Sequence, residues 1–391
     1  MSAPIRSDDE LIAARKSVGG SINKTAALVG MARSSVQERF KRMALKGYSP
    51  EHDWDHITPD GFRAGGVSTY YNKDGVPTAQ WVKATADQAR QQEILRAAFD
   101  GLADTLPRMK TISPPKVVND DLLSLYVITD YHMGMLAWPE ETKGDAWDTD
   151  IAERMLHGYF DFATERAAPS KVGVLAQLGD MLHFDSLDAV TPLHKNILDA
   201  DTRFPRLVRA TYNSLKYGVK KMLEKHELVK VIIAEGNHDL ASSVHLREHI
   251  AAVFEDNPRV EVDVSPAPYY CVEHGDVSLF FHHGHLKKPG DIDKTFTAMF
   301  REVFGRTKAS YGHMGHMHNK LVVESSLMQI EQHRTLAAPD AYAARNGYMA
   351  GRDASVITYH RHRLSEQGRF TVTPGEIWDA IASTNKLREA A

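Results

Sequence analysis

Apolar residues recur along the chain in two spacings, which predict different structures in its two parts. Across residues 8–46 the apolar residues recur at helical intervals, and Gly30 interrupts the pattern. Three short helices are therefore predicted in this segment. From residue 121 onward, apolar runs of strand length occur at 122–129, 172–178, 229–234 and 277–281. Helical stretches such as 151–166 and 206–226 alternate with these runs, which indicates an α/β domain.

These patterns divide the chain into predicted segments: a helical head at 1–50, a connector with a hairpin and a helix at 51–118, the α/β domain at 119–365 and a C-terminal extension at 366–391. The hairpin is predicted from strands 68–71 and 79–82, and the connector helix at 84–106. No apolar run is long enough to span a membrane, and the amino terminus lacks the apolar core of a signal peptide. We therefore expect a cytoplasmic protein without a membrane partner.

Polar turns follow the strand-like runs, and they carry aspartate, asparagine and histidine. In chain order they are Asp130-Tyr131-His132, Gly179-Asp180 with His183, Gly236-Asn237-His238-Asp239, His282-His283-Gly284-His285 and Gly315-His316-Met317-His318. Folds of this class bind ligands beyond the carboxyl ends of their strands. These turns are therefore the candidate functional site.

Composition narrows the chemistry of that site. The chain has 20 histidines and one cysteine, Cys271, which excludes a disulfide scaffold and Cys-rich zinc or iron–sulfur sites. Neutral imidazole and carboxylate suit Mn, Fe or Zn, and two divalent cations ~3.5–4 Å apart can clamp a phosphoryl group and activate a hydroxide. An Asp-x-His or His-x-His pair on an extended backbone would place both side chains on the same side. A preceding glycine would let the backbone approach the ions closely.

The five motifs, in this order, resemble those of the calcineurin-like metallophosphoesterase superfamily, which run D-x-H, G-D, G-N-H-[DE], H and G-H-x-H. The resemblance implies an α/β fold, a four-layer αββα sandwich of two mixed sheets flanked by helices, preceded here by a small all-α head. It also implies two divalent metal ions, with Mn²⁺ as the first expectation and Fe, Zn and Mg as alternatives.

The same resemblance assigns roles to individual residues. One metal would be held by Asp130, His132 and His318, the other by Asn237, His283 and His316, and Asp180 would bridge the two. His238 would steady the scissile phosphate or protonate the leaving oxygen, and Asp239 would orient the His238 ring.

The residues after Gly179-Asp180 bear on the substrate. His183 matches a substrate-positioning histidine of the SbcD-type DNA-repair nucleases, which favours phosphodiester substrates. The protein-phosphatase branch expects Asp-Arg-Gly and an arginine where this chain has Asp185-Ser186-Leu187 and Leu240-Ala241-Ser242. This departure speaks against phosphoprotein substrates.

The head is basic, whereas the rest of the chain is acidic. Residues 1–50 hold nine Lys/Arg and four Asp/Glu, against 38 and 47 in the remainder. The spacing of Ala26, Gly30 and Val36 resembles the helix-turn-helix of resolvase- and Fis-like regulators. Its recognition helix would present to DNA the residues Arg33, Ser34, Ser35, Gln37, Arg39, Lys41 and Arg42. The alternative is a three-helix protein-interaction module whose basic face is only solvated.

Together these features predict a metal-dependent phosphodiesterase that hydrolyses DNA, as an endo- or exonuclease, and that the head targets to DNA. DNA is the expected partner, and because heads of this kind often work as dimers, a homodimer is a further expectation. The fused architecture resembles nuclease-type proteins of phages and prophages, which implies the host cytoplasm. Two alternatives stay open: a DNA-tethered phosphatase or small-nucleotide phosphodiesterase, and a DNA-binding regulator whose phosphoesterase domain is only structural.

Overall fold

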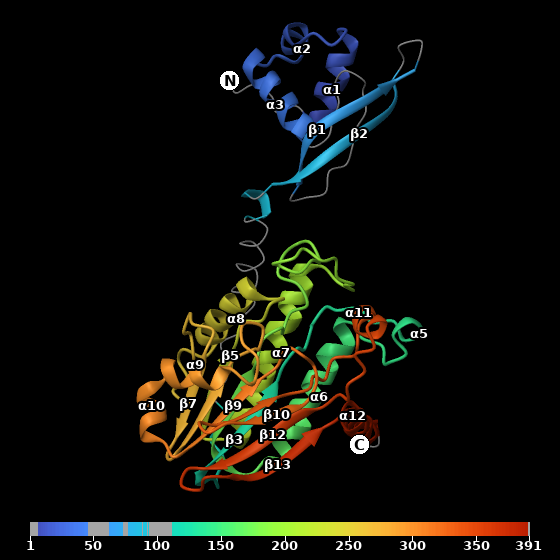
Figure 1. Cartoon of the computed structure of the whole chain (residues 1–391). Helices are drawn as coiled ribbons and strands as arrows, with labels where there is room; N and C mark the ends of the chain where they lie inside the picture. Colours follow the sequence, from blue (N-terminus) through green and yellow to red (C-terminus); the bar gives the residue numbers. More distant parts are fainter. Residues whose placement is uncertain are drawn as a thin grey trace. The chain divides into compact units, whose positions relative to one another are not determined.

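The computed structural model describes residues 7–45, 62–72, 77–87, 89–91, 93 and 112–389. The chain forms two compact units, Met1–Thr105 and Leu106–Ala391 (Figure 1). The described elements of the first unit are α1 (Asp8–Ser17), α2 (Ile22–Val29), α3 (Arg33–Leu45), β1 (Phe62–Tyr71) and β2 (Pro77–Ala86). The prediction of three helices in the head is confirmed.

The three helices share a small core of their own, formed by Leu11, Ala26, Val29, Val36, Phe40 and Met43. Ser7 and Glu10 form a capping box at the start of α1, and the Ser21 side chain caps α2. Gly30 ends α2 in the left-handed conformation at φ 70°, which turns the chain into α3. Val36 then packs, fully buried, against the other helices, as the helix-turn-helix spacing predicts.

The hairpin of the first unit is longer than its sequence pattern suggested. Strands β1 and β2 pair antiparallel over ten residues each. The predicted connector helix does not begin at residue 84, because β2 continues to Ala86. Most of the remaining predicted helix, like the turn at 73–76, lies outside the described residues.

Two mixed sheets form the centre of the second unit. The six-stranded sheet has the order β13-β12-β3-β4-β5-β6. Its parallel neighbours are β3 (Asn119–Ile128), β4 (Ser170–Gln177), β5 (Leu228–Ile233) and β6 (Val260–Val262). Strand β12 (Ala354–His360) is antiparallel to both of its neighbours, β3 and β13 (Glu366–Val372). The five-stranded sheet has the order β10-β11-β9-β8-β7, from β10 (Leu321–Glu324), β11 (Gln329–Gln332), β9 (Ala309–Met314), β8 (Val277–Phe281) and β7 (Tyr270–His274).

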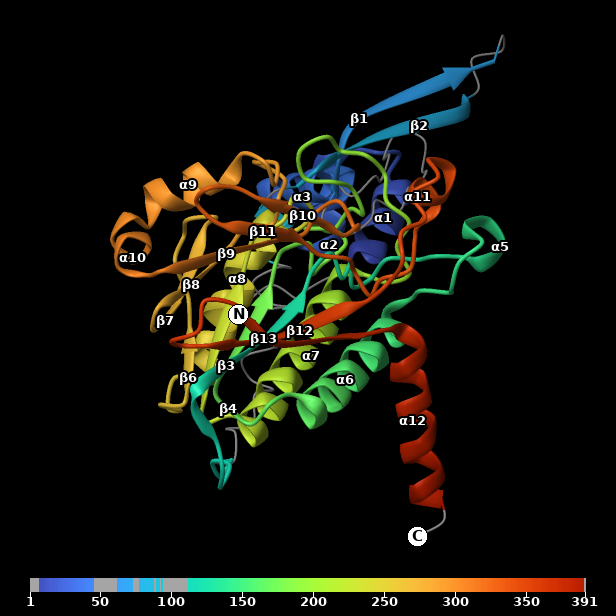
Figure 2. The same cartoon turned by 60° about the horizontal axis from the view of Figure 1, so that its bottom comes forward.

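Helices cover the outer faces of both sheets. Helices α7 (Phe204–Lys225) and α8 (Leu240–Val253) pack against the six-stranded sheet, and α6 (Thr149–Arg166) lies beside α7. Flanking the five-stranded sheet are α9 (Ile292–Met299) and α10 (Arg301–Arg306). The remaining helices are α5 (Pro139–Thr142), α11 (Ala341–Arg345) and α12 (Pro374–Glu389), the last packing on α6 (Figure 2). The predicted architecture of two mixed sheets flanked by helices is confirmed.

The main core lies between the two sheets. On β3, Leu123, Leu125 and Val127 point inward, where they meet residues of the second sheet such as Leu279 and Phe281. This alternation is the two-residue period of a strand, and it leaves the even-numbered residues of β3 for the helix side. Burial on both faces holds the strand ends firmly in place. Of the described helices, none is both long and apolar enough to cross a membrane.

Candidate metal centre

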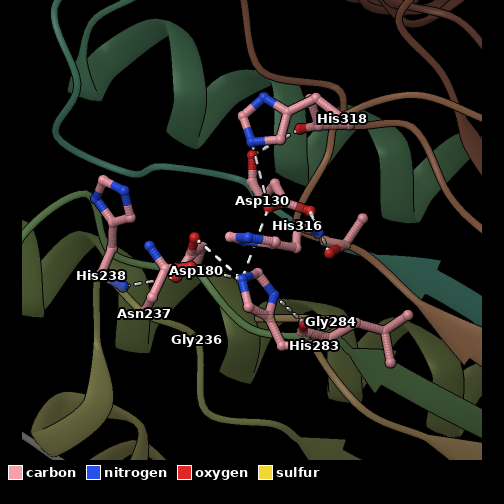
Figure 3. A network of polar contacts seen from close by, with 12 residues as sticks. Asp130, Asp180, Gly236, Asn237, His238, His283, Gly284, His316 and His318 are labelled. Atoms are coloured by element: carbon pink, nitrogen blue, oxygen red, sulfur yellow. Dashed lines mark hydrogen bonds and ion pairs between the residues drawn. The ribbon is translucent and has the colours of Figure 1, made fainter. Parts of the chain in front are cut away.

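The polar turns meet because the strands before them end at the same side of the two sheets. The parallel strands β3, β4 and β5 lead into the turns that begin near Asp130, Gly179 and Gly236. From the other sheet, the parallel neighbours β8 and β9 lead into the turns around His283 and His316. Figure 3 shows these side chains converging. The apolar pattern of the sequence does not predict β9 (Ala309–Met314), although the Gly-His-x-His turn follows it.

The first group of side chains is formed by Asp130, His132 and His318. The Nε2 atom of His318 lies 3.2 Å from Oδ1 of Asp130, and 3.3 Å from Nε2 of His132. One ligand atom from each of the three residues lies within 4.8 Å of the others. This is the trio that the resemblance assigns to one metal.

The second group is formed by Asp180, His283 and His316, with Asn237 beside it. The Nε2 atom of His283 lies 3.2 Å from Oδ2 of Asp180 and 3.2 Å from Oδ1 of Asn237. Its Nδ1 donates to the Leu178 carbonyl at 2.7 Å, so Nε2 is the nitrogen turned toward the carboxylates. The groups adjoin, because this same Nε2 lies 4.0 Å from Oδ1 of Asp130.

The backbone at this site is unusual. Among the described residues, seven that are not glycine have positive φ angles, and five of them are predicted ligands: Asp130, His132, Asp180, His316 and His318. Such left-handed conformations are disfavoured for side-chain-bearing residues and cluster at functional sites. The expectation that the Asp-x-His and His-x-His pairs lie on extended backbone is therefore wrong. Both residues of each pair turn to the left-handed region, and that turn, not strand alternation, brings the two side chains together.

Two glycines allow the closest approaches. A Cβ atom at Gly236 would lie 2.0 Å from Oδ1 of Asp180, and one at Gly315 would lie 1.8 Å from Oγ1 of Thr129 and 2.5 Å from Oδ2 of Asp130. No other residue fits at either position. The close approach that the sequence predicted for these glycines is thus to the carboxylates.

The electrostatics of the site favour ionised carboxylates. Burial alone would raise the pKa of Asp130, but His318 and His283 hold that pKa well below its ordinary value. The pKa of Asp180 is likewise lowered by His283 and His238 against the effect of burial. Burial and the neighbouring His238 lower the pKa of His132 well below its ordinary value, so His132 is neutral. Buried carboxylates beside a neutral imidazole are the donors that divalent cations of this class require.

The predicted catalytic residues lie beside these groups, but Asp239 has another role than expected. His238 donates from its Nδ1 to the His183 carbonyl at 2.8 Å, so this carbonyl orients the ring. Asp239 instead accepts backbone N–H bonds from Gly236, Asp180, Met181 and Leu182 at 2.7–3.2 Å. Its carboxylate therefore ties the Gly-Asp turn to the Gly-Asn-His-Asp turn. Burial and the nearby Asp180 raise the pKa of Asp239 to about 7.

His183 is fully enclosed in the site. Its Nδ1 lies 3.4 Å from Nδ1 of His132, and its ring stacks on that of His238 with centroids 5.6 Å apart. Burial and His238 lower the pKa of His183 to about 3. The ring is therefore neutral, and with His132 and His238 it forms a third group whose ligand atoms lie within 4.8 Å of one another.

Two threonines that the sequence reading missed support Asp130. The Thr129 hydroxyl donates to Oδ2 of Asp130 at 2.6 Å, and the Thr335 hydroxyl donates to the Asp130 carbonyl at 2.7 Å. The backbone N–H of His316 also donates to Oδ2, at 2.8 Å. No sequence motif predicts a role for Thr335, because Thr335 lies 205 residues from Asp130 along the chain.

A separate buried group is formed by His313, Glu331 and His333. Nδ1 of His313 lies 3.0 Å from Nε2 of His333, and Nε2 of His313 lies 3.1 Å from the Tyr359 hydroxyl. Glu331 is already held by both terminal nitrogens of Arg369, at 2.6 and 2.5 Å. Since the charge of Glu331 is compensated and the two imidazole rings are hydrogen-bonded, we interpret this group as a structural hydrogen-bond network.

The head residues predicted to contact DNA lie on α3. Six of them have exposed side chains: Arg33, Ser34, Ser35, Gln37, Lys41 and Arg42. Arg39 differs, because it is half-buried and its guanidinium pairs with Asp8 of α1. Arg39 therefore ties α3 to α1, and its pairing with Asp8 distinguishes it from the six exposed residues.

No protein-family model matches the chain, and no curated protein matches it in sequence. Among solved structures, it is similar to an uncharacterised predicted phosphoesterase from Streptococcus pneumoniae TIGR4 (11% identity, TM-score 0.28, covering 64% of this chain and 97% of that one). It is also similar to a novel archaeal phosphodiesterase (11% identity, TM-score 0.32, covering 64% of this chain and 99% of that one). A third similar structure is Vps29 complexed with zinc from Entamoeba histolytica (11% identity, TM-score 0.26, covering 65% of this chain and 99% of that one). At these identities and TM-scores the likeness does not indicate what this chain binds or hydrolyses.

Proposed function

We propose that the chain is a metallophosphoesterase that hydrolyses phosphodiester bonds of DNA with two divalent cations. The observation that carries this proposal is the convergence of five turns from two sheets on Asp130 and Asp180, each surrounded by imidazoles. A structural core would not retain, at such backbone strain, two buried carboxylates that lie 3.2 Å and 4.0 Å from one imidazole nitrogen, Nε2 of His283.

The donor set fits two divalent cations. Asp130, His132 and His318 would hold one, Asn237, His283 and His316 the other, with Asp180 between them. When bound, such cations activate water and neutralise charge on a phosphoryl group. Oδ1 of Asp130 lies 3.2 Å from Nε2 of His318 and 4.0 Å from Nε2 of His283, which supports its assignment to the first cation.

The residues of the chain supply orientation and a proton. The His183 carbonyl fixes Nδ1 of His238 as the donor nitrogen, which leaves Nε2 of His238 to face the substrate. Because Nδ1 already carries a proton, Nε2 carries one only in the doubly protonated ring. That imidazolium would give its Nε2 proton to the leaving sugar oxygen as the phosphodiester bond breaks, and would be left as the neutral Nδ1–H form. Asp239 keeps the two neighbouring turns in register and takes no direct part.

The choice of DNA as substrate rests on the head. Its helices have the helix-turn-helix spacing, and exposed arginine and lysine side chains lie along α3. Cationic residues on a recognition helix bind phosphates and base edges. A regulator with an inactive phosphoesterase domain is disfavoured, since the whole ligand set is present and gathered.

Digestion of end-labelled linear and covalently closed circular DNA with Mn²⁺ tests this proposal. Cleavage of circles would establish an endonuclease, and loss of the linear form alone an exonuclease. Asp180→Ala should abolish either activity. If the wild type cuts neither form, whether single- or double-stranded, yet hydrolyses bis-p-nitrophenyl phosphate, DNA is not the substrate and the small-nucleotide alternative replaces it.

A further inference from the structure

Exposed aromatic side chains gather on two short helices of the second unit. Trp138 precedes α5, and Tyr342 and Tyr348 lie in and just after α11. They are 58%, 67% and 62% exposed, and the two tyrosine rings lie 6.2 Å apart at 58°. We call these three residues the aromatic rim. A contiguous exposed apolar patch is typical of an interaction site, whereas single exposed rings are not.

The rim is held together and is fixed to the candidate metal centre. Helices α5 and α11 are in contact, and Arg345 of α11 pairs with Glu141 of α5 at 2.6 Å. Both figures show these helices side by side. Trp138 follows His132 by six residues, and Tyr342 follows Thr335, which donates to the Asp130 carbonyl, by seven. These short segments tie Trp138 and Tyr342 to the centre, and Tyr348 follows through its ring contact with Tyr342.

The helix that carries the tyrosines is well anchored. Asp340 caps α11 by accepting from the Ala343 N–H at 2.8 Å, and the Tyr348 N–H donates to the Ala343 carbonyl at 2.9 Å. Asp340 also lies near His318. Burial lowers the pKa of His318, but the carboxylates of Asp130, Asp180 and Asp340 raise it, and the net direction is upward. The tyrosine rings are thus presented by a fixed turn beside a predicted ligand.

The charges at the rim show what part of a substrate it suits. Arg345 pairs with Glu141, and Arg352 pairs with Asp145. With these guanidinium groups compensated, the rim offers mainly flat rings, and the exposed Lys143 at the end of α5 adds a single cation, not a run of cations for several phosphates. A substrate whose phosphate lies at the metal centre would therefore present its planar apolar part to the rim. Nucleobases have that shape and stack on aromatic side chains.

We propose that the aromatic rim binds the nucleobase next to the phosphodiester held at the metal centre, so that the nucleoside is recognised by stacking. The proposal rests on the phosphodiesterase function proposed above and adds the residues that select nucleosidic substrates. The base belongs either to a DNA strand or to a small nucleotide, and both sources share this chemistry.

Two esters with the same leaving group test the proposal in the full chain with Mn²⁺. Thymidine 5′-(p-nitrophenyl phosphate) carries a base, and methyl p-nitrophenyl phosphate does not. Replacing both rings, Tyr342→Ala with Tyr348→Ala, should lower kcat/KM for the thymidine ester about tenfold and leave the methyl ester unchanged. Tyr342→Phe should keep the wild-type rates. Met299→Ala is the matched control, because Met299 is an exposed apolar residue (48%) on α9, a helix on the opposite side of the unit in both figures.

A binding measurement separates this inference from the proposed function. Thymidine 5′-monophosphate should quench the fluorescence of Trp138, and the loss of this quenching in Trp138→Phe identifies Trp138 as its source. The double tyrosine variant should need about tenfold more nucleotide for half-maximal quenching. If neither ester is hydrolysed but this shift occurs, the rim stands and the phosphodiesterase function fails.

The rim proposal is overturned by unchanged kinetics in the double variant, by an equal loss for both esters, or by the absence of quenching in the wild type. A parallel loss on single-stranded oligonucleotides assigns the base to a strand. A loss confined to the thymidine ester assigns it to a small nucleotide.

Discussion

At the scale of single residues, Gly236 controls the distance between two turns of the centre. Changing Gly236 to Ala would put a methyl group 2.0 Å from Oδ1 of Asp180 and 2.3 Å from its backbone nitrogen. Since backbone must move, we expect hydrolysis to fall ~100-fold or more and the free energy of unfolding to fall by about 1–3 kcal/mol. Urea denaturation and phosphodiester hydrolysis measure the two effects. Gly290→Ala is the control and should change neither quantity, because a Cβ atom added at Gly290 would meet no other atom within 4 Å. Wild-type activity and stability in Gly236→Ala would contradict this geometry.

His226 gives a residue-scale prediction about pH. It is fully buried, its Nε2 lies 2.7 Å from the Tyr126 hydroxyl and its Nδ1 lies 2.8 Å from the Ser170 carbonyl. Burial lowers the pKa of His226 from 6.5 to about 4. The unfolded chain therefore binds the proton first as pH falls, so this stability is present above pH ~6.5 and is lost between ~6.5 and ~4, by about 3 kcal/mol at most.

Urea denaturation from pH 7 to pH 4 measures this loss. In His226→Asn the unfolding free energy should be lower at pH 7 but should decline less steeply with acid than in the wild type. Equal slopes in the two proteins would show that His226 does not titrate on unfolding.

At the scale of elements, the strands and helices that form the site were largely predictable, whereas its local geometry was not. The apolar runs predicted β3, β4, β5 and β8 to within a few residues. Strand β9, whose sequence Ala-Ser-Tyr-Gly-His-Met has few apolar residues, escaped this reading. The left-handed conformations at Asp130 and His316 were not predictable either, because they are imposed by contacts with turns distant in sequence.

The recognition helix α3 supports a prediction about DNA binding. Changing both Lys41 and Arg42 to Ala should weaken DNA binding and reduce the slope of log K against log salt by about 2, since each cation releases about one counterion. Mobility shifts at several salt concentrations measure this slope. Lys294→Ala, an exposed cation on α9, should leave it unchanged. An unaltered slope in the α3 variant would favour the protein-interaction alternative for the head.

At the scale of the whole molecule, each unit has its own core. Leu11, Val36 and Phe40 belong to the head core, and the second unit is built around the sheet core that includes Leu125 and Phe281. Units with separate cores can unfold separately. The hydrogen bond from the Met181 N–H to the Asp239 carboxylate, which no motif predicts, joins two turns of the second unit and does not involve the head.

Metal binding should therefore stabilise one unit only. We expect Mn²⁺ at about 100 times its Kd to raise the Tm of the second unit by about 5 °C and to leave the head transition in place. Differential scanning calorimetry with and without Mn²⁺ measures both transitions. In Asp180→Asn the shift should disappear; a shift of equal size in that variant would place the metal elsewhere.

The central claim is that Asp130 and Asp180 organise a metal-dependent phosphodiesterase. Hydrolysis of bis-p-nitrophenyl phosphate by the wild type and by Asp180→Asn, each with Mn²⁺ and with a chelator, tests it most directly. We predict hydrolysis by the wild type only when Mn²⁺ is present, and a loss of at least ~100-fold in the variant. Equal hydrolysis by the two proteins, or undiminished hydrolysis in chelator, would contradict the claim.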